Sequence, residues 1–167
     1  MKKIVSYMMT GILLLSFLLT GCGSPEPQTG KKMSMYYINT AETKVEVHEQ
    51  YLNTKTLDEQ LDETMRYLST TPEKLEYKAP LDMGFHVLDY EVEDGKLLIN
   101  VDKAYSELSP ATEVLVRAAI VRTLTQLPNV KYVGITVEDS QLYDNAGEMV
   151  GWMNADQFIN NDGNEIN

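Results

Sequence analysis

Two histidines and a few carboxylates are the side chains of this sequence best suited to acid–base chemistry. His86 has the same strand parity as Leu88 and Tyr90, so we expect it on the apolar side of a strand or at its margin. His48 belongs to the polar side of another predicted strand. A histidine at the margin of a core is more often structural than catalytic, and we predict a structural role for His86.

The carboxylates allow two kinds of chemistry, and the sequence favours neither. Asp89, Glu91 and Asp102 could supply a pair for glycoside hydrolysis. Asp89 and Glu91, however, share a solvated strand face, and Asp102 ends a strand beside a turn. The four acids within 58–63 lie along the start of a regular helix, where they suit the helix dipole and do not converge as calcium ligands do. With no Gly-x-Ser-x-Gly, His-Glu-x-x-His or P-loop pattern, we predict no catalytic residue, metal or cofactor.

A single cysteine carries the clearest chemical signal. An apolar run at 12–19 follows two lysines and is shorter than the ~20 residues of an ordinary membrane span. It ends in Leu19-Thr20-Gly21-Cys22, which resembles the lipobox of bacterial lipoproteins. That resemblance implies a leader of residues 1–21, cleavage after Gly21, and a thioether-linked diacylglycerol on Cys22. Because two acyl chains anchor a protein stably, we expect a lipid-anchored protein on the extracytoplasmic face of the cell membrane.

Composition limits the partners. The 167 residues suit one domain plus a leader, and 43% hydrophobic residues can fill a core. The formal net charge is −11, and loss of Lys2 and Lys3 with the leader leaves 12 basic against 25 acidic residues, or −13. Such a surface repels nucleic-acid phosphates, so nucleic acid is excluded as a partner. With Cys22 as its only cysteine, the chain forms no internal disulfide.

The stretch from His86 to Asp139 reads strand, tight turn, strand, helix, strand. Asp94-Gly95 between two apolar runs predicts a two-residue turn with Glu93 opposite Lys96. That register pairs Val92 with Leu97, Tyr90 with Ile99 and Leu88 with Val101, and it places all six on one face.

Two helices are predicted. Thr56 and Glu59 form a capping box before a helix that ends near Thr70. Ser109 and Pro110 begin a second helix that ends at Leu127, before a proline, and its wide apolar surface indicates a helix covered on most sides. Glu113 and Arg117, four residues apart, are expected at its most hydrated edge.

The other segments are assigned more coarsely. Residues 22–33 are predicted to be a flexible tether, 34–160 the folded domain and 161–167 a disordered tail. Strands are expected at Met35–Asn39, Lys44–Tyr51 and Val130–Val137, a hairpin at Leu142–Trp152, and a short closing element at Ala155–Ile159. Gly134 lies on the opposite face of its strand from Val133, and its lack of a side chain allows another group to approach the strand closely there.

These elements follow a pattern that extends over most of the chain. Its quoted residues are Pro80, the hairpin Val87–Val92 with its turn, Ile99–Asp102, Leu108, the helix end Thr123–Leu127, the strand Val133–Val137, Leu142, Gly147, Val150–Met153 and Phe158. The pattern resembles the GerMN domain of spore-germination and sporulation proteins over residues 34–160. The resemblance implies an α+β domain, similar to ring-building domains of secretion and sporulation assemblies. It also implies a secreted or lipid-anchored protein, as members of the GerMN family often are.

We therefore predict an α+β fold in which two helices pack on one face of a mixed sheet, in the order β(β)αββαββ. A ferredoxin-like βαββαβ arrangement is the alternative. The expected function is non-enzymatic: protein–protein assembly at the cell envelope, which the resemblance links to sporulation or germination. A domain that binds peptidoglycan or another wall glycan is the second hypothesis, and a wall hydrolase is the third. Tyr132, Asp89 and Glu91 are the candidate contact residues.

Overall fold

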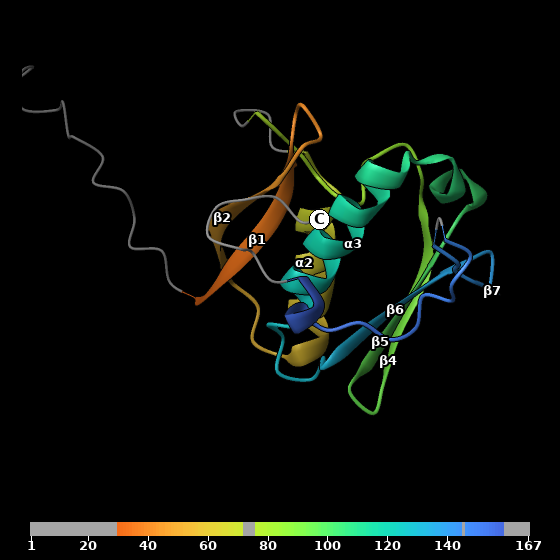
Figure 1. The fold of residues 1–167 in the computed structure, drawn as a ribbon. Coiled ribbons are helices and arrows are strands. Elements are labelled where there is room, and N and C mark those ends of the chain that lie inside the picture. The colour runs from red at the N-terminus through yellow and green to blue at the C-terminus, as the bar shows by residue number, and fades with distance from the viewer. Residues whose placement is uncertain (1–29, 72–75, 145, 159–167) are drawn as a thin grey trace, which may run out of the picture.

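The computed structural model describes residues 30–71, 76–144 and 146–158 (Figure 1). The predicted leader, Cys22 and the predicted tail lie outside these residues, as does Asn145 of the last predicted turn. The elements, in chain order, are β1 (Lys31–Asn39), β2 (Val45–Leu52), α2 (Leu57–Leu68), β3 (Tyr77–Lys78), β4 (Val87–Glu93), β5 (Lys96–Val101), η2 (Lys103–Glu107), α3 (Pro110–Leu124), β6 (Tyr132–Val137), β7 (Ser140–Gln141) and η3 (Ala155–Phe158).

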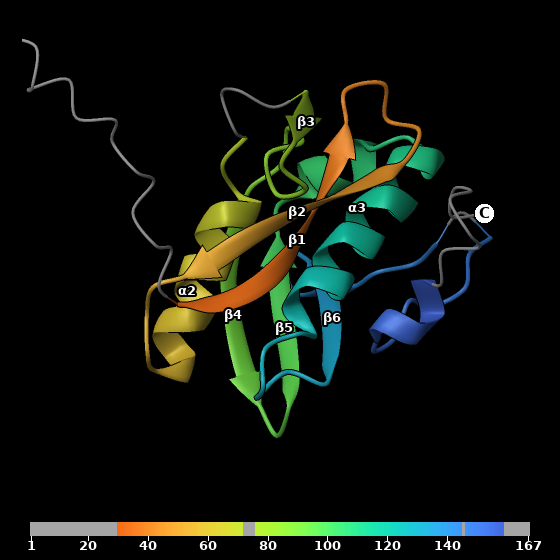
Figure 2. The same ribbon diagram turned by 90° about the vertical axis from the view of Figure 1, so that its left-hand side faces the viewer.

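The chain forms three layers, with both helices between two sheets (Figures 1 and 2). One sheet has the strand order β2-β1-β3, and the other has the order β4-β5-β6-β7. In the second sheet β5 and β6 are parallel and the other pairs antiparallel, so it is mixed. The α+β class and the helices on one face of a mixed sheet are confirmed. Neither helix is long and apolar enough to cross a membrane, within the part of the chain that the structure describes.

The first two strands do not join the mixed sheet, whereas the sequence predicted a single sheet. β1 begins at Lys31, before the expected Met35, and so includes the last residues assigned to the tether. Its buried side chains Met33, Met35 and Tyr37 give it an apolar face of its own. That face covers the side of the helices opposite β4–β7, and the separate sheet rules out a ferredoxin-like arrangement.

Helix α3 is the central element, as its wide apolar surface indicated. The Ser109 side chain accepts from the Thr112 N–H, and Pro110 occupies the first turn. Side chains at the end of α3 and just beyond it also hold β1: the backbone N–H groups of Ser34 and Tyr36 donate to Gln126 Oε1 and Thr123 Oγ1, both at 3.0 Å. The part of the β1 edge that β3 leaves free is therefore covered by side chains.

The prediction that Glu113 and Arg117 lie at the most hydrated edge of α3 was wrong. Their side chains are only 12% and 14% exposed, and Glu113 Oε1 lies 2.6 Å from Arg117 Nε. The Tyr105 hydroxyl donates to the same Glu113 oxygen at 2.9 Å, and an Arg117 nitrogen lies 3.9 Å from Met153 Sδ. The spacing of four residues correctly predicts an ion pair, but chain segments before and after the helix cover it.

The hairpin register is confirmed near the turn and wrong at its far end. Glu93 pairs with Lys96 and Tyr90 with Ile99, but a bulge at Leu88 brings Val87 opposite Val101. An extra residue reverses the alternation of side chains on its far side. Leu88 is exposed as a result. His86 lies beyond the bulge with its side chain 83% exposed and not toward the core.

The turn itself has the expected conformation, with φ of 50° at Asp94 and 79° at Gly95. A Cβ added at Gly95 would meet the Lys131 side chain at 3.5 Å, an ordinary contact, so the cost of a substitution there is conformational. We expect Gly95→Val to lower the free energy of unfolding by more than about 1 kcal/mol. Urea denaturation measures this, with Gly95→Asn as the milder matched change. Equal midpoints for Gly95→Val and the unchanged protein would exclude this turn type.

Helix α2 begins with the predicted capping box, and an acid inside the helix holds the loop before it. Glu63 Oε2 accepts from the Asn53 N–H, the Thr54 N–H and the Thr54 hydroxyl at 3.0, 3.2 and 2.7 Å. Burial alone would raise the pKa of Glu63, but these bonds and the nearby Arg66 outweigh it and hold the pKa below its ordinary value.

Because the pKa of Glu63 is lower in the folded state, the ionised side chain stabilises the fold. This stabilisation is complete above the ordinary pKa of 4.5 and is lost as the pH falls through the lowered, folded-state pKa. We expect Glu63→Gln to cost about 1–2 kcal/mol at pH 7, and this difference to shrink at pH 3. Urea denaturation at both pH values measures it. Glu91→Gln, which changes an exposed glutamate, reports the loss of one charge alone. A difference that stays constant with pH would contradict the assignment.

Candidate functional site

The outer face of the β4–β7 sheet, directed away from the helices, carries the three contact residues proposed from the sequence. The register aligns its side chains in rows across the strands. These rows are Glu93–Lys96–Tyr132, Glu91–Leu98–Gly134 and Asp89–Asn100–Thr136–Gln141. Asp89 and Glu91 are exposed, and Tyr132 is 41% exposed. The structure thus places the three on one face, and their role in binding stays a prediction.

Trp152 lies over the middle row, a position that the sequence did not reveal. A Cβ added to Gly134 would come within 2.8 Å of the Trp152 ring, so only glycine admits the ring this close. Met153 and Val133 exchange backbone hydrogen bonds of 2.8 Å in both directions, which fixes the segment beside β6. Lys96 Nζ lies 5.3 Å from the ring centroid, within the range of a cation–π contact. The sequence did carry one signal of this arrangement: the close approach predicted at Gly134 is confirmed, and the group that approaches is the Trp152 ring.

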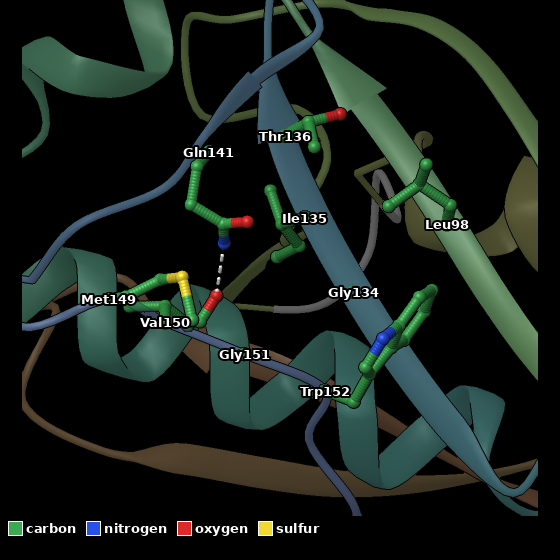
Figure 3. A pocket seen from close by; sticks show the side chains of 9 residues that line it. All are labelled: Leu98, Gly134, Ile135, Thr136, Gln141, Met149, Val150, Gly151 and Trp152. Carbon is green, nitrogen blue, oxygen red and sulfur yellow. Dashed lines mark hydrogen bonds between the residues drawn. The ribbon is translucent and has the colours of Figure 1, made fainter.

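A pocket of about 150 Å³ opens beside this indole (Figure 3). Its walls are mostly apolar and come from β5, β6, β7 and the segment before Trp152. Gln141 Nε2 donates to the Val150 carbonyl at 2.7 Å, which joins that segment to β7. The lining residues are Leu98, Gly134, Ile135, Thr136, Gln141, Met149, Val150, Gly151 and Trp152. Exposed Met149 and Trp152 at its rim give the outer face a large apolar contact area.

A buried amide orders the carboxylates at one end of the outer face. Asn100 Nδ2 donates to Asp89 Oδ2 at 3.1 Å and to Asp139 Oδ1 at 2.8 Å. Asn100 Oδ1 accepts from the Asp139 N–H at 3.0 Å and from the Thr136 hydroxyl at 3.3 Å. The buried amide is thereby satisfied, so Asp89 has a structural bond as well as an exposed position. Glu91 has no such partner among the residues that the structure describes.

His86 forms an exposed pair with Asp102 away from these rows. Its Nδ1 lies 2.9 Å from Asp102 Oδ2. The pKa of Asp102 is lowered, chiefly by the hydrogen bond from His86 and also by the backbone N–H of Ala104, which Asp102 caps. Asp89 and Asp102 are each held by a structural partner, and residues 30–71, 76–144 and 146–158 contain no cluster of acids, histidines and cysteines able to hold a metal ion.

Comparison with known proteins identifies this architecture. The sequence model of the Germane family, described as sporulation and spore germination, matches residues 34–143. No curated protein matches the chain. The first GerMN domain of the sporulation protein GerM from Bacillus subtilis has the same fold, with a TM-score of 0.55, 14% identity, and coverage of 72% of this chain and 94% of that chain. The tandem GerMN domains of that protein give 0.53 and 17%, with 81% of this chain aligned to 49% of theirs.

Proposed function

Because the chain belongs to the Germane family of sporulation and spore-germination domains, we propose that it is a non-enzymatic assembly module of the cell envelope. In this proposal a lipid on Cys22 holds the domain at the extracytoplasmic face of the membrane, and the outer face of the β4–β7 sheet binds another envelope protein. The observation that carries it is a group of exposed large side chains: Tyr132 on the outer face, and Met149 and Trp152, which line the pocket. Exposed apolar area of this kind favours an interaction site.

The leader supports the location in the envelope. It joins a positive start, an apolar run and a lipobox-like end at Cys22, each in the expected order. Eight residues separate Cys22 from Lys31, where β1 begins. Fully extended, they span at most about 30 Å. In this proposal the start of β1 therefore lies within about 30 Å of the lipidated residue.

A wall glycan is the second candidate partner, and the site offers one observation in its favour. The exposed Trp152 side chain lines the same pocket as Thr136 and Gln141, which carry polar groups. Aromatic faces with neighbouring polar groups suit a sugar ring, which is apolar on its faces and polar at its rim.

Two binding assays on the full-length protein distinguish these functions, one with solubilised membranes and one with purified peptidoglycan. We expect it to retain envelope proteins from solubilised membranes and not to sediment with purified peptidoglycan. Trp152→Ala should reduce the protein capture while leaving the urea midpoint close to that of the unchanged protein. Sedimentation with peptidoglycan that Trp152→Ala abolishes would instead establish the glycan function.

A further inference from the structure

The mixed sheet has one long free edge. Among the described residues, β4 stands at the end of the order β4-β5-β6-β7 and pairs with β5 alone (Figure 2). The strand at the other end, β7, has two residues. A free edge offers backbone donors and acceptors to a further strand. The bulge at Leu88 ends the regular part, so the usable segment of β4 runs from Asp89 to Glu93.

The register decides which backbone groups face outward. In a two-residue hairpin the residues flanking the turn, here Glu93 and Lys96, exchange both hydrogen bonds. Bonded and non-bonded pairs alternate along the ladder, so Tyr90 and Val92 direct their N–H and C=O groups away from β5. Among the described residues, no other group forms a hydrogen bond with these four backbone atoms. This spacing of two residues is the one that an added strand requires.

Acidic side chains lie on both sides of this edge. Glu91 and Asp89 are exposed on the outer face, with Glu93 next along the strand. On the inner side α2 lies beside β4, since the Tyr90 hydroxyl donates to Asp62 Oδ1 at 2.7 Å. Asp58 and Glu59 occupy the first turn of the same helix. Two cations near these acids are already engaged: Lys96 contacts the Trp152 ring, and Arg66 pairs with Glu63 at 3.9 Å.

The negative charge along the β4 edge determines which kind of strand can pair with it. A second copy of the chain, itself at net charge −11, would set carboxylates opposite carboxylates across the new strand pair, which is destabilising. A strand with alternating basic residues would place them opposite Asp89 and Glu91, and the same charges that prevent self-pairing would attract it.

We propose that β4 accepts an extended, basic segment of a partner protein, which extends the mixed sheet by one strand through the outward backbone groups of Tyr90 and Val92. This inference rests on the proposed assembly function, and it names the chemistry of the partner and the place where it binds.

The test uses two synthetic heptapeptides, one alternating lysine with valine and the other alternating glutamate with valine. Full-length protein in detergent is titrated with each, and binding is followed by the amide NMR signals of β4. We expect the lysine peptide to bind and to shift Tyr90 and Val92, and the glutamate peptide not to bind. Val92→Pro, which removes an outward N–H but no hairpin bond, should weaken binding about tenfold.

Two further variants make the result specific. Val47→Pro changes an exposed position on β2, the free edge of the other sheet, and should leave binding unchanged. Glu91→Lys should weaken binding severalfold in a salt-dependent manner, and it decides the matter if Val92→Pro does not fold. Absent binding, or equal binding of both peptides, would overturn the edge assignment. If Val92→Pro still captures envelope proteins normally, the edge fails while the assembly function stands.

Discussion

Replacement of Cys22 by serine is expected to release the protein from the membrane fraction or to leave it uncleaved with its leader. Cys22 is the only cysteine of the chain and therefore the only thiol able to form the thioether to diacylglycerol. One acyl chain anchors a protein marginally and two anchor it stably, so loss of the lipid removes the anchor itself. Metabolic labelling with a fatty-acid probe, followed by fractionation of the cells, measures both effects.

The matched control for this change is Ser24→Ala, two residues further along the chain. It alters a small polar residue without removing the thiol, and the labelled protein should stay in the membrane fraction. A Cys22→Ser protein that still incorporates the probe would refute lipid attachment at this residue. The assembly function would then have to be explained without a membrane anchor.

Replacement of Arg117 by methionine is expected to be the most destabilising change within the folded domain. Arg117 is 14% exposed and pairs with Glu113, which is 12% exposed. Methionine fills a similar volume but leaves the Glu113 carboxylate buried with only the Tyr105 hydroxyl as a hydrogen-bond partner. Breaking a buried pair in this way costs about 3–5 kcal/mol, and urea denaturation measures it.

Two further variants serve as controls for the Arg117→Met result. Lys32→Met removes an exposed ion pair with Glu49 and should leave the denaturation midpoint unchanged within error. Replacing Glu113 by leucine in the Arg117→Met protein should recover part of the lost stability, because the unpaired charge is then gone. A cost below about 1 kcal/mol for Arg117→Met alone would mean that water reaches the pair after all.

The features predicted correctly from the sequence are those that depend on neighbouring residues. Thr56 with Glu59 forms the capping box, Ser109 caps α3, and Asp94-Gly95 forms the turn. Each is decided by a hydrogen bond or a backbone angle within four residues, which the order of residue types expresses directly. The family resemblance was confirmed as well, since the sequence model of the Germane family matches residues 34–143.

The features that were missed depend on residues far apart in the chain. Whether β1 enters the mixed sheet or forms another is decided by its contacts with β2 and α3, not by its own alternation. The bulge at Leu88 has no marking residue, and it alone turns His86 outward. Similarly, the ring of Trp152 meets Gly134 across 18 residues of chain, so the outer face could be proposed only through Tyr132, Asp89 and Glu91.

The most direct test of the assembly function is photocrosslinking from position 132 in intact cells, with Cys22 unchanged. A photoreactive residue at Tyr132 reports contacts of the outer face, and one at Val47 on β2 is a control of similar exposure. We predict a discrete protein adduct from position 132 that is missing from position 47. No adduct, or identical adducts from both positions, would contradict a protein-binding role of the outer face. Degradation of purified cell wall that Asp102→Ala or Glu91→Ala abolishes would contradict the non-enzymatic function.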